Sequence, residues 1–244
     1  MTNAIRADVY RLFRAKGFWI TQLLLILLVT ASVFMKAKNT LGVGHYQGAW
    51  NGAETLFNLS DLSFLLVYFL LSLFVITIGY DLSQNALRNL LSSGVSRAQF
   101  FFTKYLIFNV VVLVQFVFYY GFGFITASLV NGIGNFPADY WGRFFAGFAL
   151  QILFTQAEFS IGIVVLYLTR RTVWAVLALI FVPYVLGIIV VQQANWLRFA
   201  VFQDAIGFAH WMPHADIPIY IAVSSATILL LVGLALFRFQ RQDL

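Results

Sequence analysis

The sequence predicts an all-α membrane protein with six transmembrane helices, and three observations lead to this fold class. Hydrophobic residues make up 61% of the 244 residues and charged residues only 10%, whereas about a quarter of a soluble domain is charged. Apolar stretches long enough to cross a hydrocarbon core of about 30 Å recur six times. Basic residues gather on alternate connections between these stretches. We therefore expect a single transmembrane domain, residues 1–244, with no soluble domain.

The basic residues fix the expected orientation of the spans. The six spans are predicted at residues 18–35, 62–80, 106–130, 144–168, 173–191 and 217–237. Most Lys and Arg residues lie before the first span, between the second and third, between the fourth and fifth, and after the sixth. The exceptions are Lys36, Lys38, Arg143 and Arg198. By the positive-inside rule, both termini are expected in the cytoplasm.

Residues 3–16 are expected to form a cytoplasmic interfacial helix. Ile5, Val9, Leu12 and Phe13 recur at helical spacing, with Arg residues elsewhere on the turn. Such a basic amphipathic helix lies in the plane of the membrane surface. The alternative is a set of topology-setting charges with incidental helicity. The basic segment and apolar run also resemble a secretory signal, but the run has the length of a span and no small-residue cleavage site follows it.

Composition and missing motifs exclude several function classes. The chain has no cysteine, which excludes disulfides, thiolate metal sites and a cysteine nucleophile. Its net charge of +6 lies at cytoplasmic helix ends, so it matches anionic lipid headgroups and not nucleic acid. The phosphate-binding pattern G-x-x-x-x-G-K-[ST] is absent, so any ATPase that drives this protein is expected to be another polypeptide.

Two external segments differ in character. The first, residues 37–60, is rich in glycine and aromatic residues and is predicted to be an irregular loop. Residues 192–216 are too apolar for a solvated loop and too broken for a span, which favours a short interfacial or re-entrant pair of helices. His210 and His214 there have H-x-x-x-H spacing, but Pro213 disfavours one helix through both. We expect interfacial polar residues and no metal site.

The cytoplasmic connection between the second and third spans is long, with twenty-four residues from Asp81 to Lys104. Hydrophobic residues recur at helical spacing, and a Ser-Ser-Gly cluster follows them, which predicts an amphipathic helix at residues 84–96. A simple link between spans needs only a few residues. This connection is therefore expected to dock a partner.

At this connection the sequence resembles the ABC transporter permeases of the ABC-2 type. Members carry a stretch similar to N-G-T-L-K-N-L-L-S-x-G-I-S-R-x-x-F-x-x-x-K, and residues 85–97 read NALRNLLSSGVSR, followed by Phe100 and Lys104. The opening IRADVYRLFR at residues 5–14, which runs into Phe18 and Trp19, is also similar to the family. Ala86 departs from the glycine that relatives often have.

The resemblance implies a subunit of an exporter and not an enzyme. In such permeases the loop forms a coupling helix that inserts into a separate ATPase, and two ATPases join two permeases, identical or homologous. ATP and Mg²⁺ would be bound by the ATPases, with no cofactor on this chain. Small permeases of this kind often serve peptide, lantibiotic or drug efflux and self-immunity in the plasma membrane of Gram-positive bacteria. The implied coupling contacts are Leu87, Arg88, Leu90, Leu91, Val95 and Arg97.

The fourth and fifth predicted spans contain the candidate translocation or gating residues. Glu158 lies deep in the fourth span, where a charge costs about 2.5–3.5 kcal/mol to insert. One helical stripe carries Gly147, Gln151, Thr155, Glu158 and Gly162. This stripe is either a polar translocation surface or a set of hydrogen-bonding packing contacts. Pro183 in the fifth span is either a hinge or a static kink.

Two other functions remain open at this stage. A stand-alone channel or secondary transporter would use Glu158 in its pathway, but it predicts repeats and paired intramembrane charges that are weak or absent here. An intramembrane metalloenzyme would need Glu158, His210 and His214 at one depth, although the sequence places the histidines outside a span. The sequence favours the exporter subunit, moving an amphipathic peptide, drug or lipid-like substrate.

Overall fold

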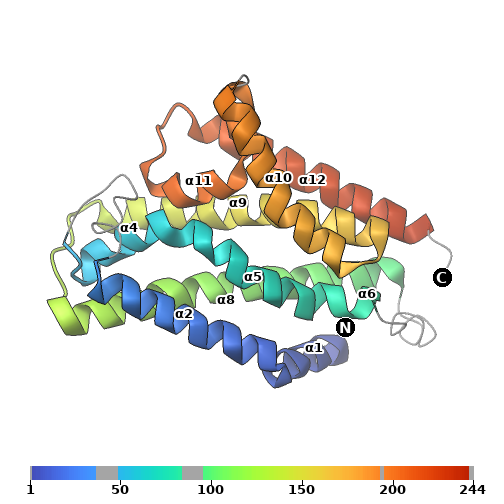
Figure 1. The fold of residues 1–244 in the computed structure, drawn as a ribbon, viewed down its shortest axis with the longest axis horizontal. Coiled ribbons are helices and arrows are strands. Elements are labelled where there is room, and N and C mark those ends of the chain that lie inside the picture. The colour runs from blue at the N-terminus through green and yellow to red at the C-terminus, as the bar shows by residue number, and fades with distance from the viewer. Residues whose placement is uncertain (1, 37–48, 84–95, 193–194, 242–244) are drawn as a thin grey trace.

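The computed structural model describes residues 2–36, 49–83, 96–192 and 195–241, and their regular structure is entirely helical. The described residues include six helices long and apolar enough to cross a membrane, which confirms the predicted number (Figure 1). Their bounds are Lys16–Phe34, Gly52–Gly79, Arg97–Asn131, Tyr140–Thr169, Thr172–Ile189 and Ile217–Arg241.

The N-terminal segment forms a helix of its own. Helix α1 (Thr2–Arg14) is separated from α2 (Lys16–Phe34) by Ala15, whose backbone is extended at φ −69° and ψ 122°. The Trp19 indole donates a hydrogen bond back to the Phe13 carbonyl oxygen at 2.8 Å. The separate helix predicted for residues 3–16 is therefore present, and its place in the cytoplasmic interface stays a prediction.

The second span begins about ten residues before its predicted start, so the expectation of an irregular loop through residue 60 is wrong. Helix α4 (Gly52–Leu62) leads through η1 (Ser63–Leu65) into α5 (Leu66–Phe74), a π turn η2 (Val75–Gly79) and α6 (Tyr80–Ser83). Asn51 starts α4 by accepting a hydrogen bond from the Glu54 amide at 2.8 Å. Polar residues in α4 lower its hydropathy, but Asn58 finds a partner in the Ala49 carbonyl oxygen at 3.0 Å.

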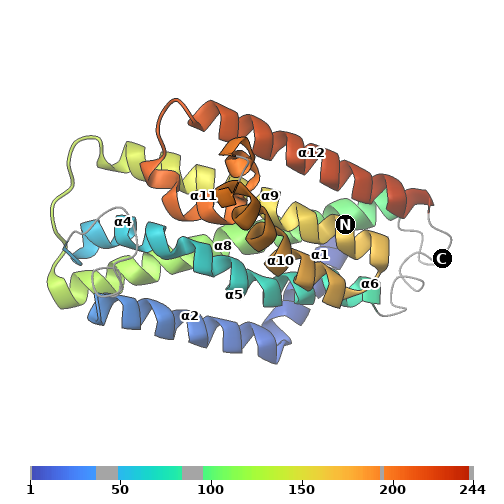
Figure 2. The same cartoon turned by 45° about the horizontal axis from the view of Figure 1, so that its top comes forward.

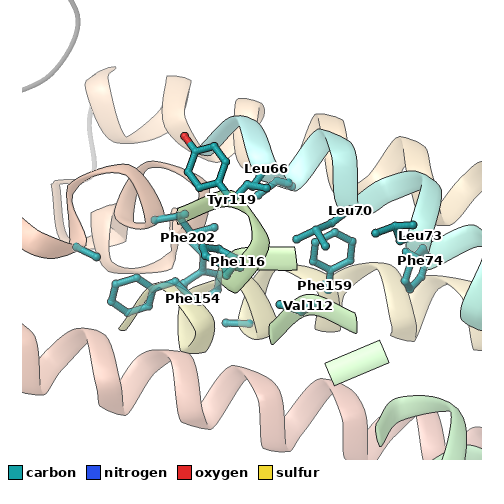
Figure 3. Close-up of a cluster of buried hydrophobic side chains, with 14 of the residues drawn as sticks. Leu66, Leu70, Leu73, Phe74, Val112, Phe116, Tyr119, Phe154, Phe159 and Phe202 are labelled. Atoms are coloured by element: carbon teal, nitrogen blue, oxygen red, sulfur yellow. The ribbon is translucent and has the colours of Figure 1, made fainter. Parts of the chain in front are cut away.

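The third and fourth spans form the centre of the bundle. Helix α8 (Arg97–Asn131) begins with a capping box between Ser96 and Gln99. Helix α9 (Tyr140–Thr169) is the most buried span. It packs against α8, α10 (Thr172–Gln192), α11 (Phe202–Phe208) and α12 (Ile217–Arg241). Figure 3 shows aromatic and aliphatic side chains from α5, α8 and α9 meeting in this core. Helix α10 continues through Pro183.

The segment before the last span is helical in short pieces, as predicted for residues 192–216. Its described part contains η3 (Asn195–Ala200), α11 and η4 (Ala209–Trp211). Phe202, Ala205 and Ile206 of α11 are buried, and α11 lies against α4 and α9 (Figure 1). This segment therefore packs into the side of the bundle, and its interfacial or re-entrant position in the membrane stays a prediction.

Several basic segments meet at one end of the bundle. Helix α1, the end of α6, the start of α8, the α9–α10 junction and the end of α12 lie together there (Figures 1 and 2). The predicted coupling helix at 84–96 lies outside the described residues except for Ser96. These segments carry most of the basic residues on which the predicted orientation depends.

Candidate functional site

A hydrogen-bonded cluster surrounds the fully buried Gln151 of α9. Its side-chain amide nitrogen is 2.9 Å from Ser60 Oγ, 2.8 Å from Ser63 Oγ and 3.0 Å from the Ile206 carbonyl oxygen. Its oxygen accepts a hydrogen bond from the Tyr120 hydroxyl at 2.6 Å. We call these five residues the Gln151 cluster. The cluster joins α4, η1, α8, α9 and α11, so Gln151 links elements that are distant in the sequence.

His210 extends the Gln151 cluster. One ring nitrogen, Nδ1, is hydrogen-bonded to Ser60 Oγ, and the other, Nε2, is 3.1 Å from the Phe144 carbonyl oxygen. A carbonyl oxygen can only accept, so Nε2 carries the proton and Nδ1 accepts from Ser60. Burial lowers the pKa of His210 to about 4, because desolvation disfavours the charged ring. The imidazole is therefore a neutral link between α4, η4 and α9.

The backbone of α9 leaves room for this imidazole only because residue 147 is glycine. A Cβ atom at Gly147 would overlap the ring of His210. Gly147, the first residue of the predicted stripe, thus serves close packing of His210 against α9.

The metalloenzyme alternative finds no ligand set in the described part of the chain. No group of three His, Asp or Glu residues there could hold a metal ion. Both ring nitrogens of His210 are already hydrogen-bonded, and His214 is exposed. Glu158 and the two histidines are therefore not arranged as a metal site.

Glu158 lies in a second group of polar residues, whose buried polar atoms lack hydrogen-bond partners among the described residues. Its side chain is only 1% exposed, yet Glu158 Oε1 has no hydrogen-bond partner among the described residues. The Thr155 hydroxyl, both polar atoms of the Gln156 side chain and the Ser224 hydroxyl share this condition. Buried polar atoms without partners are costly, so this group differs from the well-satisfied Gln151 cluster.

Helix packing fixes the surroundings of Glu158. Helices α9 and α10 form an antiparallel pair in which Gly162 faces the Leu179 side chain. Glu158 lies one turn before Gly162 on α9, and Pro183 lies one turn after Leu179 on α10. Because the two helices are antiparallel, Glu158 and Pro183 are at the same level. Because proline has no N–H, the Leu179 carbonyl oxygen lacks its usual helical donor there. The two predicted gating candidates thus lie at the same depth.

The last span lies on the other side of this group. Rings pair between Phe154 and Tyr220 at 5.6 Å, and between Tyr167 and Phe239 at 5.0 Å. Both helices therefore run in the same direction. Glu158 lies one turn after Phe154, and Ser224 lies one turn after Tyr220, so Glu158 and Ser224 are at the same level.

An open groove lies between the second span, α10 and α11, with a cavity volume of about 560 Å³. We call it the α10–α11 groove. It is lined by Phe64, Tyr68, Pro183, Tyr184, Gly187, Ile188, Gln203 and Asp204.

The polar side of the α10–α11 groove belongs to α11. The Gln203 amide donates to the Tyr68 hydroxyl at 2.8 Å. Burial raises the pKa of Asp204 above its usual value, and its carboxyl interacts electrostatically with that of Glu158. The sequence analysis did not single out Asp204, Gln203 or Tyr68. The available signal was an acidic residue within the apolar stretch 196–211.

A smaller cavity of about 350 Å³ lies at the opposite end of the bundle from the basic segments. Glu54, Asp139 and Arg143 line it together with the aromatic rings of Tyr140 and Trp211. Its charges of both signs and its aromatic walls are typical of the polar edge of a membrane bundle.

At the basic end, Arg97 contacts the last span. Among the implied coupling residues, Arg97 is the one that lies within the described part of the chain. The Arg97 guanidinium donates to the Gln240 carbonyl oxygen at 2.9 Å and to that of Phe239 at 3.5 Å. A cation at the C-terminal end of a helix is favourable because the free carbonyl groups carry partial negative charge. The other implied contacts lie outside the described residues, and these are Leu87, Arg88, Leu90, Leu91 and Val95.

A buried ion pair ties α1 to the same turns of α8. Lys104 Nζ lies 2.6 Å from both carboxylate oxygens of Asp8, and the two side chains are 5% and 10% exposed. Arg11 also contacts Asp8 at 2.9 Å. The start of α8 therefore holds both α1 and the end of α12.

Comparisons with protein-family models, curated proteins and solved structures found no match to this chain. The resemblance to ABC-2 permeases therefore rests on the residues of the loop and of the opening segment alone.

Proposed function

We propose that this chain is the membrane-spanning permease subunit of an ATP-binding cassette exporter that moves an amphipathic substrate out of the cell. The observation that carries the proposal is the sequence from Asn85 to Lys104, which resembles the coupling loop of ABC-2 permeases and directly follows a long apolar helix. The contacts of Arg97 with α12 and of Lys104 with α1 support it. Through these contacts, a displacement of the loop would act directly on α8, α12 and α1.

The proposed mechanism is mechanical and involves no covalent chemistry in this chain. Two partner ATPases bind ATP and Mg²⁺ and close, which displaces the coupling helix at residues 84–96. Two permeases, identical or homologous, then rock between inward-facing and outward-facing states. The proposal places the basic end of the bundle in the cytoplasm of a bacterial cell.

A pulldown from native membranes tests the partnership. The chain carrying Leu90→Asp or Arg97→Glu is compared with wild type, and the retained proteins are identified by mass spectrometry. We expect wild type to retain an ABC ATPase and both variants to lose it. Arg171→Glu is the matched control, because it reverses an exposed charge on the other connection at the basic end. Wild-type chain that retains no ATPase would overturn the proposal.

A second candidate function is a stand-alone channel or secondary transporter with Glu158 in its pathway. The observation that favours it is the buried Glu158 carboxyl oxygen without a partner, since ionisable groups at this depth often mark ion pathways. Purified chain in liposomes, with no ATPase present, would then conduct ions or protons. Glu158→Gln would abolish that flux, and an absence of flux in wild type would exclude this function.

A further inference from the structure

The α10–α11 groove has the dimensions and walls of a small-molecule site. Its volume of about 560 Å³ falls within the range of about 300–1,000 Å³ that ligand pockets occupy. Two of its lining residues are exposed tyrosines, with Tyr68 45% and Tyr184 67% exposed. Pro183 places the groove at the level of Glu158, within the span of α10.

The α10–α11 groove has one carboxyl, that of Asp204, and no basic residue among its lining residues. Asp204 is the charged residue that lines it, and the described structure gives Asp204 no hydrogen bond or ion pair. The Asp204 carboxyl interacts electrostatically with Glu158. Arg198, a cation on the neighbouring segment, contacts Asp216 at 3.2 Å instead. The Asp204 carboxyl is therefore available to pair with a cation bound in the groove.

Glu158 is a second carboxyl near the groove, although it is not one of the lining residues. It is 1% exposed, and its Oε1 atom has no partner in the described chain. Helix register places it level with Pro183, which forms one wall of the groove. One carboxyl therefore lies in the groove and another at the same depth behind its wall.

We propose that the α10–α11 groove binds a lipophilic monocation, with its charge against Asp204 and its apolar body against Tyr68 and Tyr184, while the Glu158 carboxyl lies behind the groove wall and adds to the acidic surroundings. Aromatic faces attract cations as well as apolar surface, so the same walls serve both parts of such a ligand. The groove disfavours an anion, because both nearby ionisable groups are acids. Gln203 fixes the Tyr68 ring by its hydrogen bond.

The test is equilibrium binding of tetraphenylphosphonium to the purified chain. The protein is placed in nanodiscs of zwitterionic phosphatidylcholine, and binding to empty nanodiscs is subtracted. Tetraphenylborate, an anion of nearly the same shape, separates charge recognition from partition into apolar surface. We expect saturable binding of the cation only. Asp204→Asn should weaken that binding about tenfold or more, because it removes the carboxyl that lines the groove, and Glu158→Gln should weaken it less, because Glu158 lies behind the groove wall.

Asp139→Asn is the matched control, because it makes the same chemical change at an exposed carboxyl outside the groove. It should leave the affinity unchanged. Each variant is used only if it elutes as a monodisperse species, and the comparison of the two ions in wild type needs no substitution. Equal binding of both ions, or wild-type affinity in Asp204→Asn, would overturn the proposal.

The assignment of this cation as a transported substrate rests on the proposed export function, whereas binding itself does not. The purified chain contains no ATPase, so absence of binding would leave the coupling proposal intact. Loss of the ATPase interaction in the pulldown would likewise leave the groove proposal intact.

Discussion

Replacing Gln151 by leucine tests whether this residue stabilises the bundle or serves the transport path. Leucine has similar volume but makes no hydrogen bonds. The change removes the bond from Tyr120 and the contacts to Ser60, Ser63 and the Ile206 carbonyl oxygen. Each of these groups is buried, so water cannot readily replace the amide.

The expected magnitude follows from the number of contacts. Side-chain hydrogen bonds between membrane helices contribute about 0.6 kcal/mol on average. The bond from Tyr120 and the two N–H donors of the Gln151 amide make three hydrogen bonds, so the expected loss is about 2 kcal/mol. The Ser63 hydroxyl keeps its contact to the Ser60 carbonyl oxygen at 2.6 Å, which limits the loss.

The assay is reversible unfolding in mixed micelles, followed by tryptophan fluorescence as the fraction of denaturing detergent rises. Gln151→Leu should unfold at a lower fraction than wild type. Gln22→Leu is the control, because Gln22 is half-buried and hydrogen-bonds one partner only, the Gln115 side chain, at 2.9 Å and 3.3 Å, so its loss should be smaller. Wild-type stability in Gln151→Leu would refute a structural role, and loss of transport without loss of stability would assign Gln151 to the pathway.

Three further predictions use the same unfolding assay. Gly147→Ala should destabilise the bundle, because the added methyl group overlaps the His210 ring; a wild-type unfolding curve would contradict this packing. Lys104→Met should destabilise by roughly 2 kcal/mol, less than the about 3–5 kcal/mol of a fully broken buried pair because Arg11 still contacts Asp8; adding Asp8→Asn should restore part of the loss. The folded pKa of His210 is lowered from 6.5 to about 4, so the unfolded state binds more protons and stability should fall as pH decreases through this window; His210→Gln should remove that component, and equal pH profiles would contradict it.

The sequence predicted the spans well where apolar residues continue without interruption. The last span was expected to begin at Ile217, as it does in α12. The fourth was expected at 144–168 and extends over Tyr140–Thr169. A long apolar stretch in lipid must form a helix, because its backbone polar groups can be hydrogen-bonded only within the segment itself. Hydropathy alone therefore predicts these helices.

The start of the second span was missed for a physical reason. Helix α4 carries Asn58, Ser60 and Asp61 on buried positions, which lowers its hydropathy to that of a loop. Their partners come from elsewhere in the chain: Trp211, for example, donates to Asp61 at 2.9 Å. Side-chain hydrogen bonds between distant segments leave no periodic signal in a sequence.

The candidate site was predicted in part. All members of the α9 stripe are buried, as expected, but the structure divides them by their partners. Gln151 is fully hydrogen-bonded, whereas Glu158 Oε1 has no partner. Asp204 could not be connected with Glu158 beforehand, because only the packing of α11 against α9 brings them together.

The contacts at the start of α8 have a practical consequence for protein engineering. Asp8 near one end of the chain and the Gln240 carbonyl oxygen near the other both bind side chains in the first three turns of this helix. A bulky fusion at either terminus would therefore press on the residues that directly follow the predicted docking loop. Reporter domains are better inserted in the exposed connection between α8 and α9, at the opposite end of the bundle (Figure 1).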